Sequence, residues 1–537
     1  MRTFFLSTFC VAASFSATAA LAQTPQTKIE PMQTGLYEPT WESLAQYECP
    51  EWFRDAKFGI WAHWGPQCQP EAGDWYARHM YYKGEGQHDF HVKKYGDPKE
   101  FGFKDVINEW KAEEWDPDAL IKLYKRVGAK YFMALGNHHD NMDLWDSQYQ
   151  PWNSVNVGPK KDIIGGWAKA CEKYGLPFGV SIHAAHAWSW YEGSQDYDGN
   201  LTKADGKGKW WEGLDPQDLY AQRHPRSKGS ENVGTIHSQW NWGGGVTPPS
   251  EAFITNIYNR TLDVVNKYHP TMLYFDDTVL PFYPISDIGL KIAAHLYNRS
   301  RQLHHGNNEA VVMGKILSEQ QKKCILWDVE RGAPDKAQQL PWQTCTCIGD
   351  WHYNRSVYDQ NRYRSASAVI KMLVDVVSKN GNLLLSVPLR GNGSLDEKEK
   401  NVLEGIAAWM EVNGESIYGT RPWVLFGEGP SAETARPLNA QGFNEGQSQS
   451  ATDIRYVKKN GSLYVTALGW PESRFLKLKA LAINSGNYQG KVKSVELLGY
   501  GRVEYRSTED GLKVLLPSAP VNAIAPVLKV KFTRKIQ

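Results

Sequence analysis

The segment Phe58-Gly-Ile-Trp-Ala-His63 combines two features that recur along this chain: a short, continuous apolar run and a polar side chain at its end. Continuous runs rich in β-branched and aromatic residues are typical of strands buried on both faces, as in parallel sheets. Seven further runs of this kind follow, at 131–135, 178–183, 272–276, 310–313, 324–327, 344–348 and 383–387. The pattern predicts eight parallel strands.

Amphipathic stretches separate these runs. Apolar residues recur at helical spacing in 116–127, 162–174, 253–268 and 365–377. Strands that alternate with helices from residue 58 to residue 387 favour an α/β fold closed into a (β/α)8-like barrel. An open doubly wound sheet is the alternative, but no Gly-x-Gly-x-x-Gly motif follows an early run.

The sequence pattern changes past Pro422. Short alternating strand patterns occupy 462–466, 492–498 and 512–516, and the turn pairs Asn460-Gly461 and Asp510-Gly511 precede two of them. We expect a catalytic domain over 40–422 and a C-terminal antiparallel β-sandwich over 423–537. The Gly- and Gln-rich stretch at 439–450 is expected to be a loop.

The first 22 residues are typical of a secretory signal. Arg2 gives a positive start, an apolar run follows, and Ala20-Leu21-Ala22 resembles a cleavage site. We therefore expect a secreted or periplasmic protein. No later run reaches about 18 apolar residues, and 60 Lys and Arg residues balance 59 Asp and Glu residues, so neither a membrane nor a nucleic-acid partner is expected.

Two residue types outside the strands add information. Six of the seven cysteines follow the signal, and we expect buried thiols, with disulfides as the alternative in an oxidising compartment. The chain also holds 22 Trp and 27 Tyr residues. Such a surplus fits either a large aromatic core or a protein that stacks rings against sugars, because the C–H faces of sugars pack on flat aromatic surfaces.

Polar side chains gather at or just after the ends of the predicted strands, which is the face where barrel active sites form. These residues are His63, His138, His139, His183, His186, Asp276 and Glu330. A retaining glycosidase needs two carboxyl groups about 5–5.5 Å apart, a nucleophile and an acid/base. Asp276 and Glu330 are the best pair, with Glu330 expected in a loop. Asp277 should point to the other side of the strand, because successive side chains alternate.

Several segments resemble glycoside hydrolase family 29, the α-L-fucosidases, in order from about residue 50 to about residue 425. The matching segments are Lys57-Phe-Gly-Ile-Trp-Ala-His-Trp-Gly65, Asp74-Trp-Tyr76, His138-His-Asp140, Leu144-Trp-Asp-Ser147, Trp152-Asn-Ser154, Pro270-Thr-Met-Leu-Tyr-Phe-Asp276, Val377-Ser-Lys-Asn-Gly-Asn-Leu-Leu-Leu385 and Asn413-Gly-Glu-Ser-Ile-Tyr-Gly-Thr-Arg-Pro-Trp423.

The resemblance implies roles for individual residues. Asp276 would attack the anomeric carbon, Glu330 would be the acid/base, and Trp351 would sit near the leaving group. The fucose hydroxyls would be contacted by His63, Trp75, His138 and His139. Asp74, His183 and Tyr274 are also expected to bind the substrate. The resemblance implies a fucose-like glycan as substrate, with no metal and no organic cofactor.

The chain departs from the family pattern around the sugar at subsite −1, where Asp74 replaces Glu, Tyr274 replaces Trp, Asn141 replaces Gly, and His183 and His186 occupy a strand end that often carries Tyr. A polar pocket near C5 would favour the extra hydroxyl of L-galactose over the methyl group of L-fucose. We therefore expect an exo-α-L-fucosidase, with an exo-α-L-galactosidase acting on marine galactan as the alternative.

Two hypotheses from other classes are weaker. A non-catalytic carbohydrate-binding protein would explain the aromatic residues but would not need Asp276 and Glu330 on one rim. A metal-dependent hydrolase would normally carry a His-x-His or His-Glu-x-x-His motif, and neither occurs. His138 and His139 are adjacent, so on a strand they would point to opposite faces.

Overall fold

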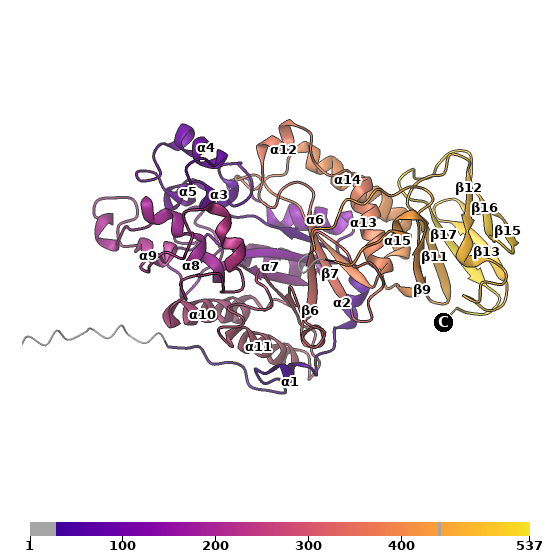
Figure 1. The fold of residues 1–537 in the computed structure, drawn as a ribbon, viewed down its shortest axis with the longest axis horizontal. Helices are drawn as coiled ribbons and strands as arrows, with labels where there is room; N and C mark the ends of the chain where they lie inside the picture. Colours follow the sequence, from indigo (N-terminus) through magenta and orange to yellow (C-terminus); the bar gives the residue numbers. More distant parts are fainter. Residues whose placement is uncertain (1–27, 439–441, 537) are drawn as a thin grey trace, which may run out of the picture.

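The computed structural model describes residues 28–438 and 442–536. Eight parallel strands form a closed barrel in the order of the sequence (Figure 1). They are β1 Phe58–Ala62, β2 Tyr131–Asn137, β3 Phe178–Ile182, β4 Met272–Phe275, β5 Val311–Gly314, β6 Leu326–Glu330, β7 Trp342–Cys347 and β8 Gly381–Ser386. The predicted barrel is confirmed. The predicted signal over 1–22 and residues 439–441 of the predicted loop lie outside the described residues.

Long helices pack around the barrel, and the four predicted helices are confirmed to within two residues. They are α6 Pro117–Val127, α7 Ile163–Tyr174, α10 Glu251–Tyr268 and α13 Ala366–Ser378; α11 Ile288–Leu303 and α14 Glu397–Asn413 add two more. Side chains that accept a backbone N–H at the first turn start the four predicted helices: Asp116, Asp162, Ser250 and Ser365. Short helices occur at α1 Trp41–Leu44, α2 Glu51–Ala56, α12 Arg355–Asp359 and α15 Pro430–Glu433.

Strand β6 extends further than its apolar run predicted. Asp328 lies in the middle of the strand, where its Oδ1 accepts a 2.8 Å hydrogen bond from Gln343 Nε2 on β7. Because this buried carboxyl is satisfied inside the barrel, the strand continues to Glu330, which pairs with Cys345. The expectation that Glu330 lies in a loop is therefore wrong, and a rigid strand end holds its backbone.

Two long excursions rise from the carboxyl ends of the strands. The first follows β1 and contains α3 Tyr76–His79, α4 Gly86–Tyr95 and α5 Phe103–Glu109; the second follows β3 and contains α8 Ala187–Trp190, α9 Pro216–Tyr220 and the 3-10 helix η5 Val233–Gln239. Figure 1 shows them side by side at one end of the barrel. A buried ion pair of 3.1 Å between Lys104 and Asp198 joins them, and Tyr81 donates a 2.7 Å hydrogen bond to the same carboxylate. They frame the mouth of the barrel.

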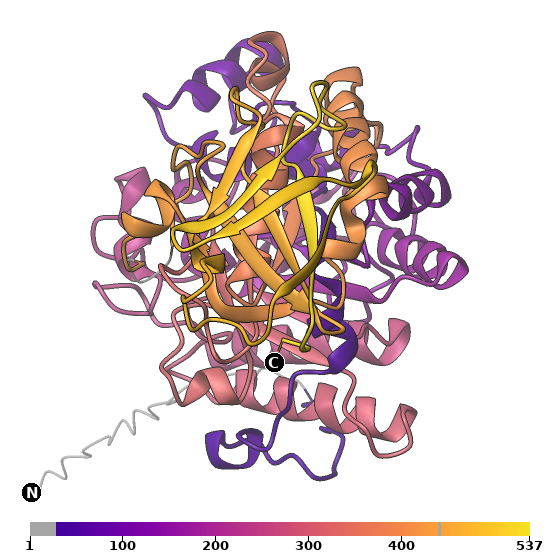
Figure 2. The same cartoon turned by 90° about the vertical axis from the view of Figure 1, so that its right-hand side faces the viewer.

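The C-terminal part of the chain forms two antiparallel sheets with their own hydrophobic core, as predicted. One sheet has the order β14-β13-β17-β11-β10-β9 and the other β12-β16-β15, and Figure 2 shows them lying across one side of the barrel. The strands are β9 Arg421–Glu428, β10 Ile454–Lys459, β11 Ser462–Ala467, β12 Phe475–Leu478, β13 Val492–Leu497, β14 Gly501–Arg502, β15 Glu504–Thr508, β16 Gly511–Leu515 and β17 Val527–Phe532.

Two expectations from the composition can be compared with the described residues. The cysteines there are all free thiols, five of them buried, as expected: Cys49, Cys68, Cys171, Cys324, Cys345 and Cys347. Over the same residues, no helix combines the length and the apolar character that crossing a bilayer requires.

Candidate active site

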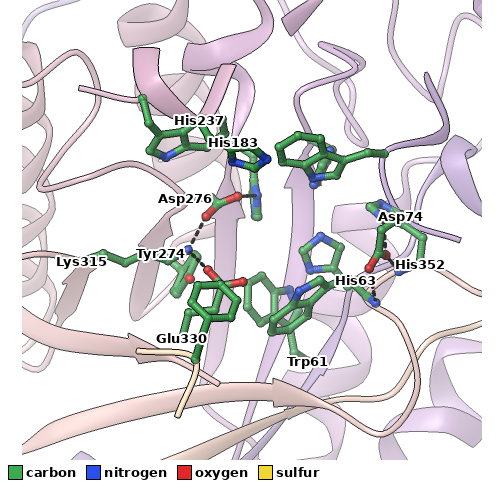
Figure 3. A pocket seen from close by; sticks show the side chains of 15 residues that line it. Trp61, His63, Asp74, His183, His237, Tyr274, Asp276, Lys315, Glu330 and His352 are labelled. Carbon is green, nitrogen blue, oxygen red and sulfur yellow. Dashed lines mark hydrogen bonds and ion pairs between the residues drawn. The ribbon is translucent and has the colours of Figure 1, made fainter. Parts of the chain in front are cut away.

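A cavity opens at the carboxyl ends of the barrel strands (Figure 3). Its lining consists of Trp61, His63, Asp74, Trp75, His138, His183, His237, Trp240, Tyr274, Asp276, Lys315, Glu330, Trp351, His352 and Phe443. The expected catalytic and substrate-binding residues all lie in this lining except His139, which is buried behind Asp276. Barrel closure thus brings together residues from six strand ends, as the barrel prediction required.

Three charged side chains lie together on one side of the cavity, as Figure 3 shows. Asp276 follows β4, Lys315 follows β5 and Glu330 ends β6. The Lys315 ammonium contacts Asp276 Oδ1 and lies 2.7 Å from Glu330 Oε2. Because an N–H···O hydrogen bond measures about 3 Å between heavy atoms, two oxygens bonded to one nitrogen lie at most about 6 Å apart. We name Asp276, Lys315 and Glu330 the charged wall.

Asp276 is held as a carboxylate. Its Oδ2 lies 3.2 Å from His139 Nε2 and 3.2 Å from His183 Nδ1. Burial alone would raise the pKa of Asp276, but the Lys315 ammonium and the hydrogen bonds from both histidines outweigh it and hold that pKa well below its usual range. Asp276 is therefore ionised at neutral pH, the state that a nucleophile requires.

His139 lies between two oxygen atoms. Its Nδ1 lies 2.6 Å from the carbonyl oxygen of His183, and its Nε2 faces the Asp276 carboxylate. A carbonyl and an ionised carboxylate can only accept hydrogen bonds. The Nε2 of His139 therefore donates to the Asp276 carboxylate, which supports the negative charge on that oxygen.

The opposite side of the cavity consists of His63, His138 and His352, which we name the imidazole wall (Figure 3). Their ring centroids lie 4.7–5.2 Å apart. Burial lowers the pKa of His63 and His138 well below the usual range, so both are neutral. Within the described residues, neither nitrogen of His63 or His352 has a hydrogen-bond partner. A neutral imidazole offers one donor and one acceptor, which suits a sugar hydroxyl.

Backbone contacts occupy the Asp74 carboxylate. Its Oδ1 accepts the His352 N–H at 2.7 Å and its Oδ2 accepts the Trp351 N–H at 3.2 Å. The side chain still lines the cavity, but its hydrogen bonds fix the segment that carries Trp351 and His352. The shorter arm of Asp74 relative to the family's glutamate is thus used to position two neighbours. Its expected contact with the sugar stays a prediction.

Two residues expected to shape the sugar pocket lie outside it. Asn141 donates to the carbonyl of Leu219 at 2.8 Å and accepts from Arg260 at 2.6 Å. His186 stacks between two tryptophans of the second excursion, and its Nε2 lies 3.0 Å from Asp277 Oδ1. Local packing therefore holds both side chains away from the cavity. Asp277 contacts His186 and, like it, does not line the cavity.

His138 and His139 do not point to opposite faces, so that expectation is wrong. Strand β2 ends at Asn137, and both histidines follow it in a turn. Their ring centroids are 4.5 Å apart. Because the two-residue alternation of a strand no longer applies, His138 joins the imidazole wall while His139 supports Asp276.

Two groups of side chains have the proximity that metal ligands need. His138, His139, His183 and Asp276 form one group, and the imidazole wall forms the other. A metal ion in the first group would share Asp276 with the Lys315 ammonium, and the two cations would repel each other. The second group holds imidazoles only, and a neutral imidazole can also donate a hydrogen bond to a hydroxyl group or accept one from it.

Several site residues were missed by the sequence analysis. Lys315 lies two residues past the fifth apolar run, so the rule that polar residues follow strand ends would have found it. His237 and Trp240 come from the second excursion, where both stack on Trp75. No periodic pattern marks that excursion, and none marks Phe443, so only the fold reveals them.

Comparisons with known proteins agree with this geometry. A family model described as alpha-L-fucosidase matches residues 24–415, and one described as alpha-L-fucosidase C-terminal domain matches 447–533. The tissue alpha-L-fucosidase of Homo sapiens is 25% identical and covers 91% of this chain and 89% of its own. An alpha-L-fucosidase of Branchiostoma floridae is 26% identical, covering 82% and 84%. The solved Thermotoga maritima alpha-fucosidase in complex with fucose shares the fold, with 24% identity, a TM-score of 0.68 and coverage of 92% and 100%.

Proposed function

The chain belongs to the α-L-fucosidase family of glycoside hydrolases, and on this premise we propose that it is a retaining exo-α-L-fucosidase that removes terminal α-L-fucosyl residues from oligo- or polysaccharides. The observation that carries the proposal is the Lys315 ammonium in contact with both Asp276 and Glu330. The nearest oxygens of the two carboxyl groups therefore lie within about 6 Å of each other, which is compatible with the separation of about 5–5.5 Å in retaining enzymes. The signal predicted at 1–22 adds export from the cytoplasm to the proposal.

The first half of the reaction forms a glycosyl-enzyme. An Asp276 carboxylate oxygen bonds to the anomeric carbon while the glycosidic C–O bond breaks, and Glu330 gives its proton to the departing oxygen. Asp276 loses its negative charge as the ester forms, and Glu330 gains one as it deprotonates. Lys315 therefore faces one full carboxylate before and after the step, so its charge stays compensated.

The second half reverses these roles. Glu330 takes a proton from a water molecule, whose oxygen bonds to the anomeric carbon as the ester bond to Asp276 breaks. Two inversions at one carbon retain its configuration. His139 and His183 bind the Asp276 oxygen that Lys315 does not contact, so the released carboxylate returns to a site already organised for its charge.

L-fucose is favoured over L-galactose at subsite −1. Asn141 and His186 are two of the five residues whose identity suggested a polar pocket near C5, and neither side chain lines the cavity. The Tyr274 hydroxyl donates to Asp328 Oδ2 at 3.3 Å, so the tyrosine presents its ring to the cavity. A preference of about a thousandfold for an aryl α-L-galactoside over the matching fucoside, measured by kcat/KM, would contradict this assignment.

The stereochemistry of the product tests the mechanism. Nuclear magnetic resonance of the reaction with an aryl α-L-fucoside should show α-L-fucose first, with the β-anomer appearing only through mutarotation. Release of the β-anomer first would mean an inverting enzyme and would overturn the roles of Asp276 and Glu330. A chain that binds fucose without turnover would be a carbohydrate-binding protein instead.

Glu330→Gln tests the acid. Substrates with poor leaving groups should slow about 10²- to 10⁴-fold, whereas activated aryl fucosides should lose much less in the first step, because only the former need a proton. Asp74→Asn is the matched control, since Asp74 lines the same cavity but contacts backbone N–H groups. Equal losses on both substrate types in Glu330→Gln would indicate a structural role.

A further inference from the structure

A segment from outside the barrel reaches the catalytic strand β6. Residues 442–445 lie in the connection between α15 and β10, and Gly442 forms a parallel bridge with Glu330. The Phe443 N–H donates to the Glu330 carbonyl at 2.9 Å, and the Glu445 N–H donates to the Arg331 carbonyl at 3.1 Å. The segment thus adds a short strand-like edge to β6 at the proposed acid/base. We name 442–445 the β6 tether.

Side-chain contacts anchor the β6 tether on the C-terminal side of Phe443. The Glu445 carboxylate lies 2.7 Å from Arg331 Nε, contacts Arg364, and accepts a 2.8 Å hydrogen bond from Thr346 on β7. Asn444 exchanges two hydrogen bonds of 3.0 Å with the backbone of Ala333. Because the Glu445 side chain is only 9% exposed, these ion pairs are shielded from water and hold the backbone in place.

The tether presents Phe443 at the mouth of the cavity. Phe443 has a φ of 56°, a left-handed conformation that residues other than glycine rarely adopt. Its ring lines the cavity together with Glu330, yet the residue is 53% exposed. The strained backbone therefore holds a large apolar ring in a position where it gains little from burial in the protein itself.

We propose that Phe443 is the platform of subsite +1 and packs against a sugar ring in the leaving group. This inference rests on the proposed role of Glu330, since the departing oxygen must lie beside the acid and the next ring of the substrate must lie beyond it. Phe443 is joined to Glu330 through the backbone hydrogen bond, so the two move as a unit. The C–H face of a pyranose packs on an aromatic face, which makes a fucosyl glycan, rather than a fucoside of a small alcohol, the substrate class.

Two donors that differ only in the leaving group test the proposal. An α-L-fucosyl disaccharide places a pyranose at subsite +1, whereas α-L-fucosyl fluoride places no ring there. Phe443→Ala should lower kcat/KM for the disaccharide about 3- to 10-fold, mainly through KM, a loss typical of one aromatic contact. The rate with the fluoride should stay within about twofold of wild type. Phe443→Trp should keep the disaccharide activity.

The matched control is Phe475→Ala, because Phe475 is 61% exposed on β12 of the C-terminal domain, outside the cavity. Phe475→Ala should leave the activity toward both donors unchanged. Equal losses on both donors in Phe443→Ala, or no loss on the disaccharide, would overturn the proposal. Failure of the proposed function would appear differently, as a wild-type protein that releases fucose from neither donor.

Glu445, which holds the β6 tether in place, allows an independent test of the proposal. Glu445→Ala should release Phe443 and reproduce the disaccharide-specific loss, and the double variant Phe443→Ala/Glu445→Ala should lose no more than either single variant, because both changes remove one contact. Transfer of fucose from the fluoride to an added sugar acceptor, relative to hydrolysis, should fall about 3- to 10-fold in the same variants. Additive losses in the double variant would mean that Glu445 does not act through Phe443.

Discussion

The charged wall and the imidazole wall face each other across one cavity, yet the charge on their side chains differs. Burial disfavours charge at both. At Asp276 the Lys315 ammonium and two histidine donors overcome it and hold the pKa well below its usual range. At His63 and His138 burial is the largest cause, neighbouring imidazoles add to it, and the pKa of each falls well below its usual range.

This difference separates two tasks. The anomeric carbon needs a charged nucleophile and compensation for charge that moves between carboxyl groups, which the charged wall offers. Sugar hydroxyls need neutral groups that both donate and accept, which the imidazole wall offers. Substitutions on the charged wall should therefore affect the chemical step most, and substitutions on the imidazole wall should affect sugar binding.

Asp276→Ala should have the largest effect, a loss in kcat on the order of 10⁴-fold or more. Added azide or formate should restore part of the activity and give a product of inverted configuration, because the small anion replaces the missing carboxylate. Measuring the anomeric configuration of the azide product checks this. Asp277→Ala is the control, since Asp277 contacts His186 outside the cavity. Rescue of this variant by azide or formate would show that Asp277, and not Asp276, is the nucleophile.

Lys315→Met should cost about 10²- to 10³-fold in kcat/KM, in the range of a lost electrostatic donor. The pKa of Asp276 should rise, because Lys315 is the largest of the causes that lower it. Since Asp276 acts as an anion, the acidic limb of the pH profile of kcat/KM should move to higher pH. Lys315→Arg should keep the acidic limb near its wild-type position. An acidic limb that does not move in Lys315→Met would mean that Lys315 does not lower the pKa of Asp276.

His352→Phe should have a smaller effect, a rise in KM of about tenfold, the scale of one lost hydrogen bond. The loss should be the same for a fucosyl disaccharide and for fucosyl fluoride, because the imidazole wall faces the sugar that both donors share. His352→Gln retains a donor and an acceptor and should recover most of the affinity. A loss confined to the disaccharide would place His352 in subsite +1 instead.

The last effect concerns stability instead of catalysis. Burial lowers the pKa of His183 to about 4, and also that of His295, which lies on α11 outside the cavity. The unfolded chain takes up these protons near pH 6.5. As the pH falls from about 6.5 to 4, protons bind the unfolded state first, so stability should decrease by up to about 1.4 kcal/mol per pH unit for each histidine, and it should not change above pH 6.5.

Thermal unfolding midpoints between pH 4 and pH 7 measure this dependence. His183→Phe and His295→Phe should each make it shallower, and only His183→Phe should weaken the binding of L-fucose. An undiminished pH dependence in both variants would mean that the two imidazoles are not held neutral by the fold.

Much of the molecule follows from local sequence. Most barrel strands are apolar runs, and at several of them a polar residue of the cavity follows directly in the chain, so the sequence alone places His63, His183 and Asp276 at one rim. The C-terminal sandwich was equally visible, because alternation and turn pairs are local signals. The resemblance to the family added the order of the segments.

The tertiary structure decided how these residues combine. Lys315 contacts carboxylates that are 39 and 15 residues away in the chain, and no spacing rule links the three. His186 and Asn141 lie outside the site because they pack against residues that are distant in the chain. Phe443 lies in the site because a segment from beyond the barrel hydrogen-bonds to Glu330. Apolar periodicity records which face of an element is buried, whereas the closure of the barrel and its excursions sets which side chains meet.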